Sequence, residues 1–134
     1  MKTRVLDSWP ILEWLNGREP AFTAVNALLS AAEVGRARVL MSAINVGEVY
    51  YFLRKQHQHN AAEDWRRASG TLPVSIDVPR AENIWTAAEI KGAFPVSYAD
   101  AFAAELARRN GCPLLTGDPE FRAVADLKLE WAGS

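Results

Sequence analysis

The sequence predicts an α/β fold of three layers, in which helices cover both faces of a central parallel sheet. The alternation of two kinds of segment favours this class. Short apolar runs alternate with longer amphipathic stretches along the 134 residues, and such an alternation of strands and helices is typical of a parallel sheet. The length also suits one domain over residues 1–134, large enough to bury a stable core without disulfides.

The first elements are bounded by clear turn signals. Residues 3–6 read as a strand, and residues 8–16 as a helix that ends at Gly17. The Ala- and Leu-rich stretch 20–34 predicts a second helix, which ends at Gly35. Glycine is the residue expected just beyond a helix end, because it adopts a left-handed backbone without steric cost.

The middle of the chain repeats the pattern. Residues 38–41 predict a strand, after which Ser42 can cap a helix that runs to about residue 56. A further helix is expected over about 60–69, and a third strand over 72–76.

The last third contains two more strands and three helical segments. A helix is expected from about 79 to 91, and Ser97 opens an Ala-rich helix that ends at Gly111. The remaining expected elements are a strand at 113–116, a short helix at 119–125 and a strand at 128–131.

Composition restricts the cellular setting more than the function. Cys112 is the only cysteine, so no internal disulfide can form, which suits a reducing cytoplasm. No secretory signal and no apolar run of membrane-spanning length is visible, and we therefore expect a cytoplasmic protein without a membrane anchor. The net charge of −1 gives no support to nucleic-acid binding, which often goes with a strongly basic chain.

Four acidic residues are predicted to meet at one edge of the sheet. Asp7 and Asp118 directly follow the first and fourth strands, while Glu48 and Asp100 lie near the N-termini of helices. Ligands of such sheets bind outside the carboxyl ends of the strands. Helix N-termini lie along the same edge, because the helices run back antiparallel to the strands. The four carboxylates are therefore far apart in sequence but expected close together in space.

Each of these acids also has a purely structural explanation. Asp7 can end a strand in a turn, Glu48 can belong to a solvated helix face, Asp100 fits a capping box, and Asp118 before a proline fits an N-cap. The edge rule alone is not selective, because Asp77 follows the third strand and can cap the next helix.

Two details favour a functional role for the acids. Alanines stand three, four and seven residues after Asp100 on the same helix face, and small side chains allow close packing that draws Asp100 inward. Asn45 stands one turn before Glu48 and can orient its carboxylate. Because converging carboxylates repel, a cation is expected, and oxygen ligands select Mg²⁺ or Mn²⁺ whereas zinc prefers His or Cys.

Four short motifs contain the four acids. In order, they are Val5-Leu6-Asp7-Ser8, Asn45-Val46-Gly47-Glu48, Tyr98-Ala99-Asp100-Ala101 and Leu115-Thr116-Gly117-Asp118-Pro119-Glu120-Phe121. These motifs resemble those of the PIN domain, and most closely those of the VapC toxins of toxin–antitoxin pairs. The resemblance extends over almost the whole chain, and it rests on the order and spacing of the set, since no single motif is specific.

The resemblance implies an α/β/α sandwich and a Mg²⁺- or Mn²⁺-dependent endoribonuclease, commonly dimeric and held inactive by a cognate antitoxin. It implies that four acids bind the metal and carry the catalysis: Asp7, Glu48, Asp100 and Asp118. Polar residues expected to support them are Asn45, Thr116 and Ser8. Many relatives have a small polar residue where this chain has Trp9, which can stack an RNA base or, as we favour, pack against the protein.

Two other functions compete with the nuclease. One is a catalytically inactive PIN-like module that binds RNA or protein, against which the intact set of four acids argues. The other is a nucleotide-binding or phosphotransfer domain. No glycine-rich dinucleotide fingerprint or P-loop is present, and Trp9 stands where a haloacid-dehalogenase-type phosphatase would need a second Asp.

Overall fold

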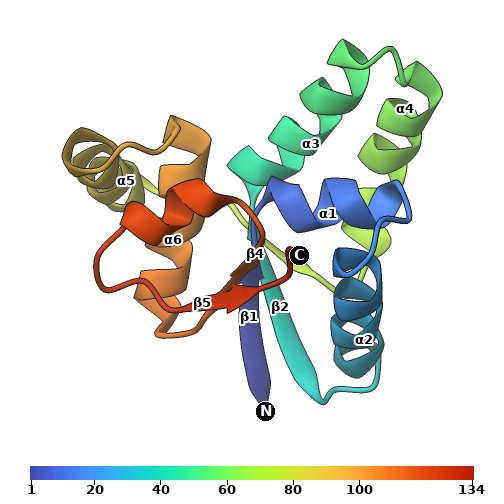
Figure 1. The fold of residues 1–134 in the computed structure, drawn as a ribbon, viewed down its shortest axis with the longest axis horizontal. Coiled ribbons are helices and arrows are strands. Elements are labelled where there is room, and N and C mark those ends of the chain that lie inside the picture. The colour runs from blue at the N-terminus through green and yellow to red at the C-terminus, as the bar shows by residue number, and fades with distance from the viewer.

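The computed structural model describes residues 1–134 and contains one five-stranded parallel sheet between two groups of helices (Figure 1). The strand order is β3-β2-β1-β4-β5, and every neighbouring pair is parallel. This confirms the predicted α/β class. The order reverses between β1 and β4, and in open parallel sheets such a reversal opens a crevice for ligands beyond the strand ends.

Six α-helices and two short 3₁₀ helices connect the strands. In chain order the elements are β1 Lys2–Leu6, α1 Ser8–Leu15, α2 Ala21–Glu33, β2 Ala37–Ser42, α3 Ala43–Lys55, α4 His59–Ala68, η1 Ser69–Thr71, β3 Ser75–Asp77, α5 Ala81–Ala93, α6 Tyr98–Asn110, β4 Leu114–Thr116, η2 Pro119–Ala123 and β5 Leu129–Trp131. No helix is long and apolar enough to cross a membrane.

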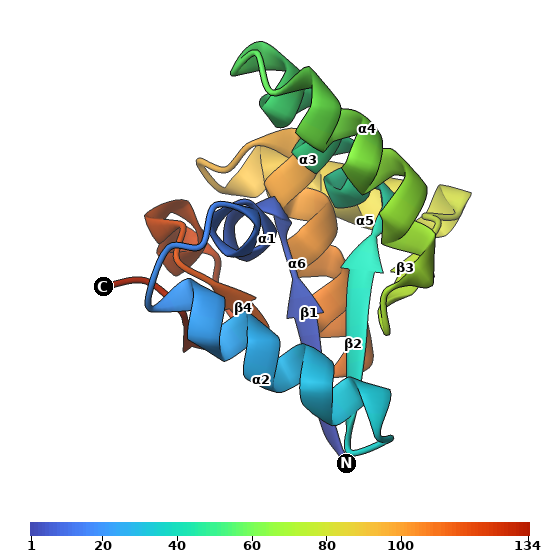
Figure 2. The ribbon, with the colours of Figure 1, turned by 90° about the vertical axis from the view of Figure 1, so that its right-hand side faces the viewer.

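The sheet has an apolar core on each face, because successive strand residues point to opposite sides. Val5 packs with residues of α5 and α6, while its neighbour Leu6 packs with residues of α1, α2, α3 and α4. Leu114 and Leu115 of β4 divide between the two cores in the same way. Figure 2 shows α1, α2 and α4 in front of the sheet and α6 behind it.

Predicted caps hold at several helix ends. Ser42 Oγ accepts a hydrogen bond from Ile44 N at 3.2 Å at the start of α3. Gly111 ends α6 in the left-handed region, with φ of 59°, where a residue without a Cβ is favoured.

Two predicted boundaries were wrong. The third strand covers Ser75–Asp77 instead of 72–76. Pro73 has no amide to donate, and its neighbours Leu72 and Val74 pack against the core outside the paired stretch. The helix expected at 119–125 is the shorter 3₁₀ segment η2.

Candidate active site

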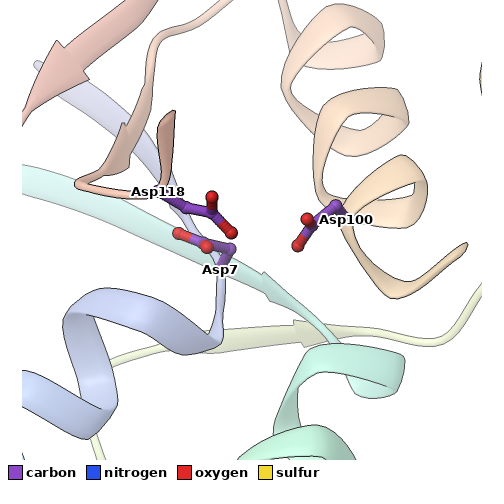
Figure 3. A group of neighbouring side chains, drawn as sticks. All are labelled: Asp7, Asp100 and Asp118. Carbon is purple, nitrogen blue, oxygen red and sulfur yellow. The ribbon is translucent and has the colours of Figure 1, made fainter. Parts of the chain in front are cut away.

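Three aspartates from separate elements meet at the reversal of strand order. Asp7 follows β1, Asp118 lies just beyond the neighbouring strand β4, and Asp100 lies in the first turn of α6. One carboxylate oxygen from each residue lies within 4.8 Å of the others. Figure 3 shows the three side chains directed toward one another across the gap between the strand ends and α6.

The turns that begin the adjoining helices hold two of these carboxylates. Asp7 is the N-cap of α1, and its Oδ2 accepts from Trp9 N at 3.4 Å. Asp118 caps η2 by accepting from Glu120 N at 3.0 Å, and its own amide donates to Thr116 Oγ1 at 3.1 Å. The structural and functional explanations of these acids are therefore compatible, because capping fixes where each carboxylate lies.

Asp100 is drawn inward by the small residues on its helix face, as predicted. Ala103, Ala104 and Ala107 are completely buried, and Asp100 itself is only 5% exposed. The cap of α6 is Ser97, whose Oγ accepts from Asp100 N at 3.1 Å. The side chain of Asp100 therefore remains available to the cluster.

Glu48 is buried beside the aspartates and held by polar neighbours. Ser8 donates its hydroxyl to Glu48 Oε1 at 2.6 Å, and Asn45 Nδ2 donates to the same oxygen at 3.3 Å. Asn45 Nδ2 also donates to the carbonyl of Ala99 at 3.1 Å, which links α3 to the start of α6. The Tyr51 hydroxyl lies 3.5 Å from Glu48 Oε2. Ser8 and Asn45 thus position Glu48, which is not one of the three acids that approach within 4.8 Å.

Asp77, the fifth acid on this edge, does not join the cluster. Its two carboxylate oxygens accept from Arg109 at 3.2 and 2.9 Å, and Arg109 also donates to the buried Glu105. Asp77 does not cap α5, whose N-cap is Arg80. It stands at the end of β3, two strands away from β1, whereas the strands that carry Asp7 and Asp118 are adjacent.

The electrostatics of the site reflect burial and mutual repulsion. The pKa of Asp7 is raised well above its usual value, first by burial and then by the charge of Asp100, while the Thr116 hydroxyl and the Trp9 amide partly lower it. The pKa of Asp100 is raised to about 8 by burial, then by the Glu120 carboxyl group and by the charges of Asp118 and Glu48. The cluster therefore tends to hold protons unless positive charge is supplied.

An open cavity of about 310 Å³ leads to the cluster. Its acidic lining is formed by Glu48, Asp100, Asp118 and Glu120, and its apolar lining by Trp9, Leu12, Tyr51 and Phe52 of α1 and α3. Neither Glu120 nor Tyr51 was predicted as a site residue. Glu120 belongs to the fourth motif, two residues after Asp118, whereas the only signal for Tyr51 is its position one helical turn after Glu48.

The residues of the cluster fit a hard divalent cation. All the available ligand atoms are carboxylate oxygens, which Mg²⁺ and Mn²⁺ prefer. Asp7 Oδ1 is buried and has no hydrogen-bond partner, although a buried carboxylate oxygen normally has one. A cation bound between Asp7, Asp100 and Asp118 would satisfy this atom and offset the repulsion.

Comparison with known proteins agrees with this geometry. The family model of the PIN domain matches residues 4–127. No curated protein matches the sequence at a significant level.

Solved structures share the fold at low sequence identity. A chain of VapBC2 from Rickettsia felis, solved bound to a DNA fragment from its promoter, superposes with a TM-score of 0.73 at 15% identity, covering 96% of this chain and 98% of that one. VapC20 of Mycobacterium tuberculosis, a toxin that cleaves the sarcin–ricin loop, gives 0.73 at 18% identity, with coverage of 90% and 93%. A chain of a toxin–antitoxin complex from Klebsiella pneumoniae gives 0.67 at 18% identity, with coverage of 92% and 94%.

Proposed function

The chain belongs to the PIN-domain family, and from that premise we propose that it is a metal-dependent endoribonuclease and the toxin of a toxin–antitoxin pair. The observation that carries the proposal is the approach of Asp7, Asp100 and Asp118 within 4.8 Å. Three separate elements bring these acids together at the reversal of strand order, and a purely structural role for each acid gives no reason for their convergence.

The three aspartates would hold Mg²⁺ or Mn²⁺, with Glu48 beside them. When bound, the cation supplies positive charge that activates water and polarises a phosphate. Glu48, which accepts hydrogen bonds from Ser8 and Asn45, would accept a proton from the attacking water. The N-termini of α1 and α6 lie at the same site, and their helix dipoles favour a bound phosphate.

The structural relatives support an antitoxin partner. The Klebsiella pneumoniae structure is a toxin–antitoxin complex, and this chain has an apolar cavity of about 220 Å³ between α1, α3 and α4. Its lining includes Trp14, Leu15, Leu53, Trp65 and Leu72. Such a cavity suits apolar side chains of a partner segment, from which a basic side chain can extend to the acidic site and inhibit it. We also propose a homodimer and, given an RNA substrate, action in the cytoplasm.

A cleavage assay tests the nuclease. Purified protein should cut a structured RNA in Mg²⁺ or Mn²⁺, and excess chelator should stop the reaction. Asp100→Asn should lower the rate on the order of a hundredfold or more, because a metal ligand is lost.

Asp64→Asn is a matched control, since Asp64 is an exposed acid on α4 that pairs with Arg67. This variant should cleave at the wild-type rate. Wild-type cleavage by Asp100→Asn, in protein free of contaminating nuclease, would remove Asp100 from the catalytic site. Absence of metal-dependent cleavage by the wild-type protein would instead support the inactive RNA- or protein-binding module.

A further inference from the structure

The cavity above the acidic cluster has two chemically different linings. The acidic lining is formed by Glu48, Asp100, Asp118 and Glu120, whereas the aromatic lining is formed by Trp9 of α1 and by Tyr51 and Phe52 of α3. The cavity is open to solvent and its apolar lining adjoins the point where a scissile phosphate would bind. A nucleotide has the same division, with a charged phosphate at one end and a flat apolar base at the other.

Tyr51 is the aromatic residue most available to a ligand. Its side chain is 46% exposed although it lies in the cavity. Its ring packs on Phe52, with centroids 4.8 Å apart and planes inclined by 36°. The ring is thus supported by the protein on one side, and the residue remains partly open to solvent, as required of a residue that stacks a base.

Tyr98 provides an internal comparison. It is 44% exposed, and its ring packs on Phe102 at a centroid distance of 4.9 Å. The two tyrosines therefore match in exposure and aromatic support, but Tyr98 does not line the cavity. A change in ligand binding that depends on the cavity should therefore follow substitution of Tyr51 but not substitution of Tyr98.

We propose that Tyr51, with Trp9 and Phe52, forms a subsite that stacks an unpaired nucleobase next to the phosphate to be cut. This inference rests on the proposed nuclease function and deepens it. A base within a duplex is stacked on both faces, so the subsite requires a nucleotide from a single strand, loop or bulge. Because every base has a π face, the subsite strengthens binding with little preference for sequence.

Two non-cleavable probes isolate the base. The first is a fluorescein-labelled hexamer of 2′-O-methyl uridylate, and the second is a labelled hexamer with the same sugar–phosphate backbone but no bases. Their affinities for the full chain are measured by fluorescence anisotropy in Mn²⁺. Stacking on aromatic residues should make the uridylate bind about fivefold to a hundredfold more tightly than the abasic hexamer.

Variants then test which residue causes the preference for the base-bearing hexamer. Tyr51→Ala should bring the two affinities together, whereas Tyr51→Phe, which keeps the ring, and Tyr98→Ala should keep the wild-type ratio. Melting curves confirm that each variant is folded. If Tyr51→Ala keeps the ratio, or if wild type binds both hexamers equally or binds neither, the subsite is wrong.

The RNA cleavage assay separates this failure from failure of the nuclease proposal. Wild-type protein that cleaves RNA but does not prefer the base-bearing hexamer has the proposed activity without the subsite. An apolar peptide can be added as a competitor. If the peptide abolishes the preference for the uridylate hexamer and leaves binding of the abasic hexamer unchanged, the result supports the subsite and shows that a protein segment can also occupy it.

Discussion

The ring of Trp9 lies so close to Gly117 that a Cβ atom added there would stand 2.3 Å from Trp9 Cη2. This contact joins the start of α1 to the turn between β4 and η2, and it fixes the residue that immediately precedes Asp118. Trp9 therefore packs against the protein, as favoured from the sequence, while part of its side chain also lines the cavity.

Gly117→Ala should impair both stability and cleavage. The added methyl group would stand 2.3 Å from a rigid ring, so either the ring or the turn must shift, and overpacking of this kind costs about 1–3 kcal/mol. Displacement of the turn also moves Asp118, so the cleavage rate should fall about tenfold or more. Thermal melting and initial rates in Mn²⁺ measure the two effects.

The double variant Trp9→Ala with Gly117→Ala is the control. Removal of the ring removes the collision, so Gly117→Ala should lower the melting temperature and the cleavage rate much less in the Trp9→Ala background than in wild type. Equal costs in the two backgrounds would show that the contact does not explain the effect.

Ser8→Ala should lower the cleavage rate about tenfold with little loss of metal binding. The variant loses the 2.6 Å hydrogen bond to Glu48, and hydrogen bonds to charged groups contribute about 1.5–3 kcal/mol. The three aspartates are unchanged, so the stabilisation of the fold by Mn²⁺ should remain. Ser30→Ala, at an exposed position on α2, should keep full activity. A Ser8→Ala variant that cleaves as fast as wild type would remove the positioning role.

The sequence was sufficient to predict the order of elements and the edge at which the acids gather. Apolar periodicity identifies strands and helices, and Asp7, Asp100 and Asp118 stand directly at element boundaries. Sequence spacing alone did not distinguish Asp77 from these acids, because its exclusion depends on strand order and on an ion pair with Arg109, 32 residues away.

Contacts between distant residues explain what else could not be predicted. Ser8 and Glu48 are 40 residues apart, and Trp9 and Gly117 are 108 positions apart in the chain. Neither pair has a local signature, since each contact arises only when α1 is placed against α3 and against the β4–η2 turn. The role of Asn45 could be predicted because its partner Glu48 lies on the same helix, one turn further along.

Trp85→Glu should shift the protein from dimer to monomer. The Ala- and Leu-rich segment 20–34 does not provide an apolar surface for a dimer, because Val25, Leu28 and Leu29 are buried within the chain. Exposed apolar residues are instead frequent between residues 76 and 85, where Val78 and Trp85 are each 72% exposed. An exposed group of this kind is typical of an interaction surface.

Light scattering at micromolar concentration measures the dimer. Val34→Glu is the control, since Val34 is 67% exposed outside this segment, and this variant should remain dimeric. Wild-type protein that is monomeric under these conditions would remove the dimer proposal, and a dimeric Trp85→Glu would place the interface elsewhere.

The stability of the metal-free protein should fall as pH rises from about 4 to about 8. The pKa of Asp100 is raised to about 8, and that of Asp7 is also raised, in both cases chiefly by burial. The folded state therefore holds protons that the unfolded state has released. Stability from this source is fully present below the unfolded pKa and is lost as pH rises through the folded pKa, with a slope of up to about 1.4 kcal/mol per pH unit for each group.

Asp7→Asn tests this account without RNA. The variant removes one buried charge, and asparagine can still accept the hydrogen bond from Trp9 N that caps α1. In chelator near neutral pH, we expect its melting temperature to exceed that of wild type by about 5 °C, while the gain from added Mn²⁺ becomes smaller. Glu33→Gln, at an exposed position on α2, should match wild type in both respects. If Asp7→Asn melts below wild type in chelator and gains as much from Mn²⁺, then Asp7 is not part of a cation-binding cluster, because neither the repulsion nor the ligand has been lost.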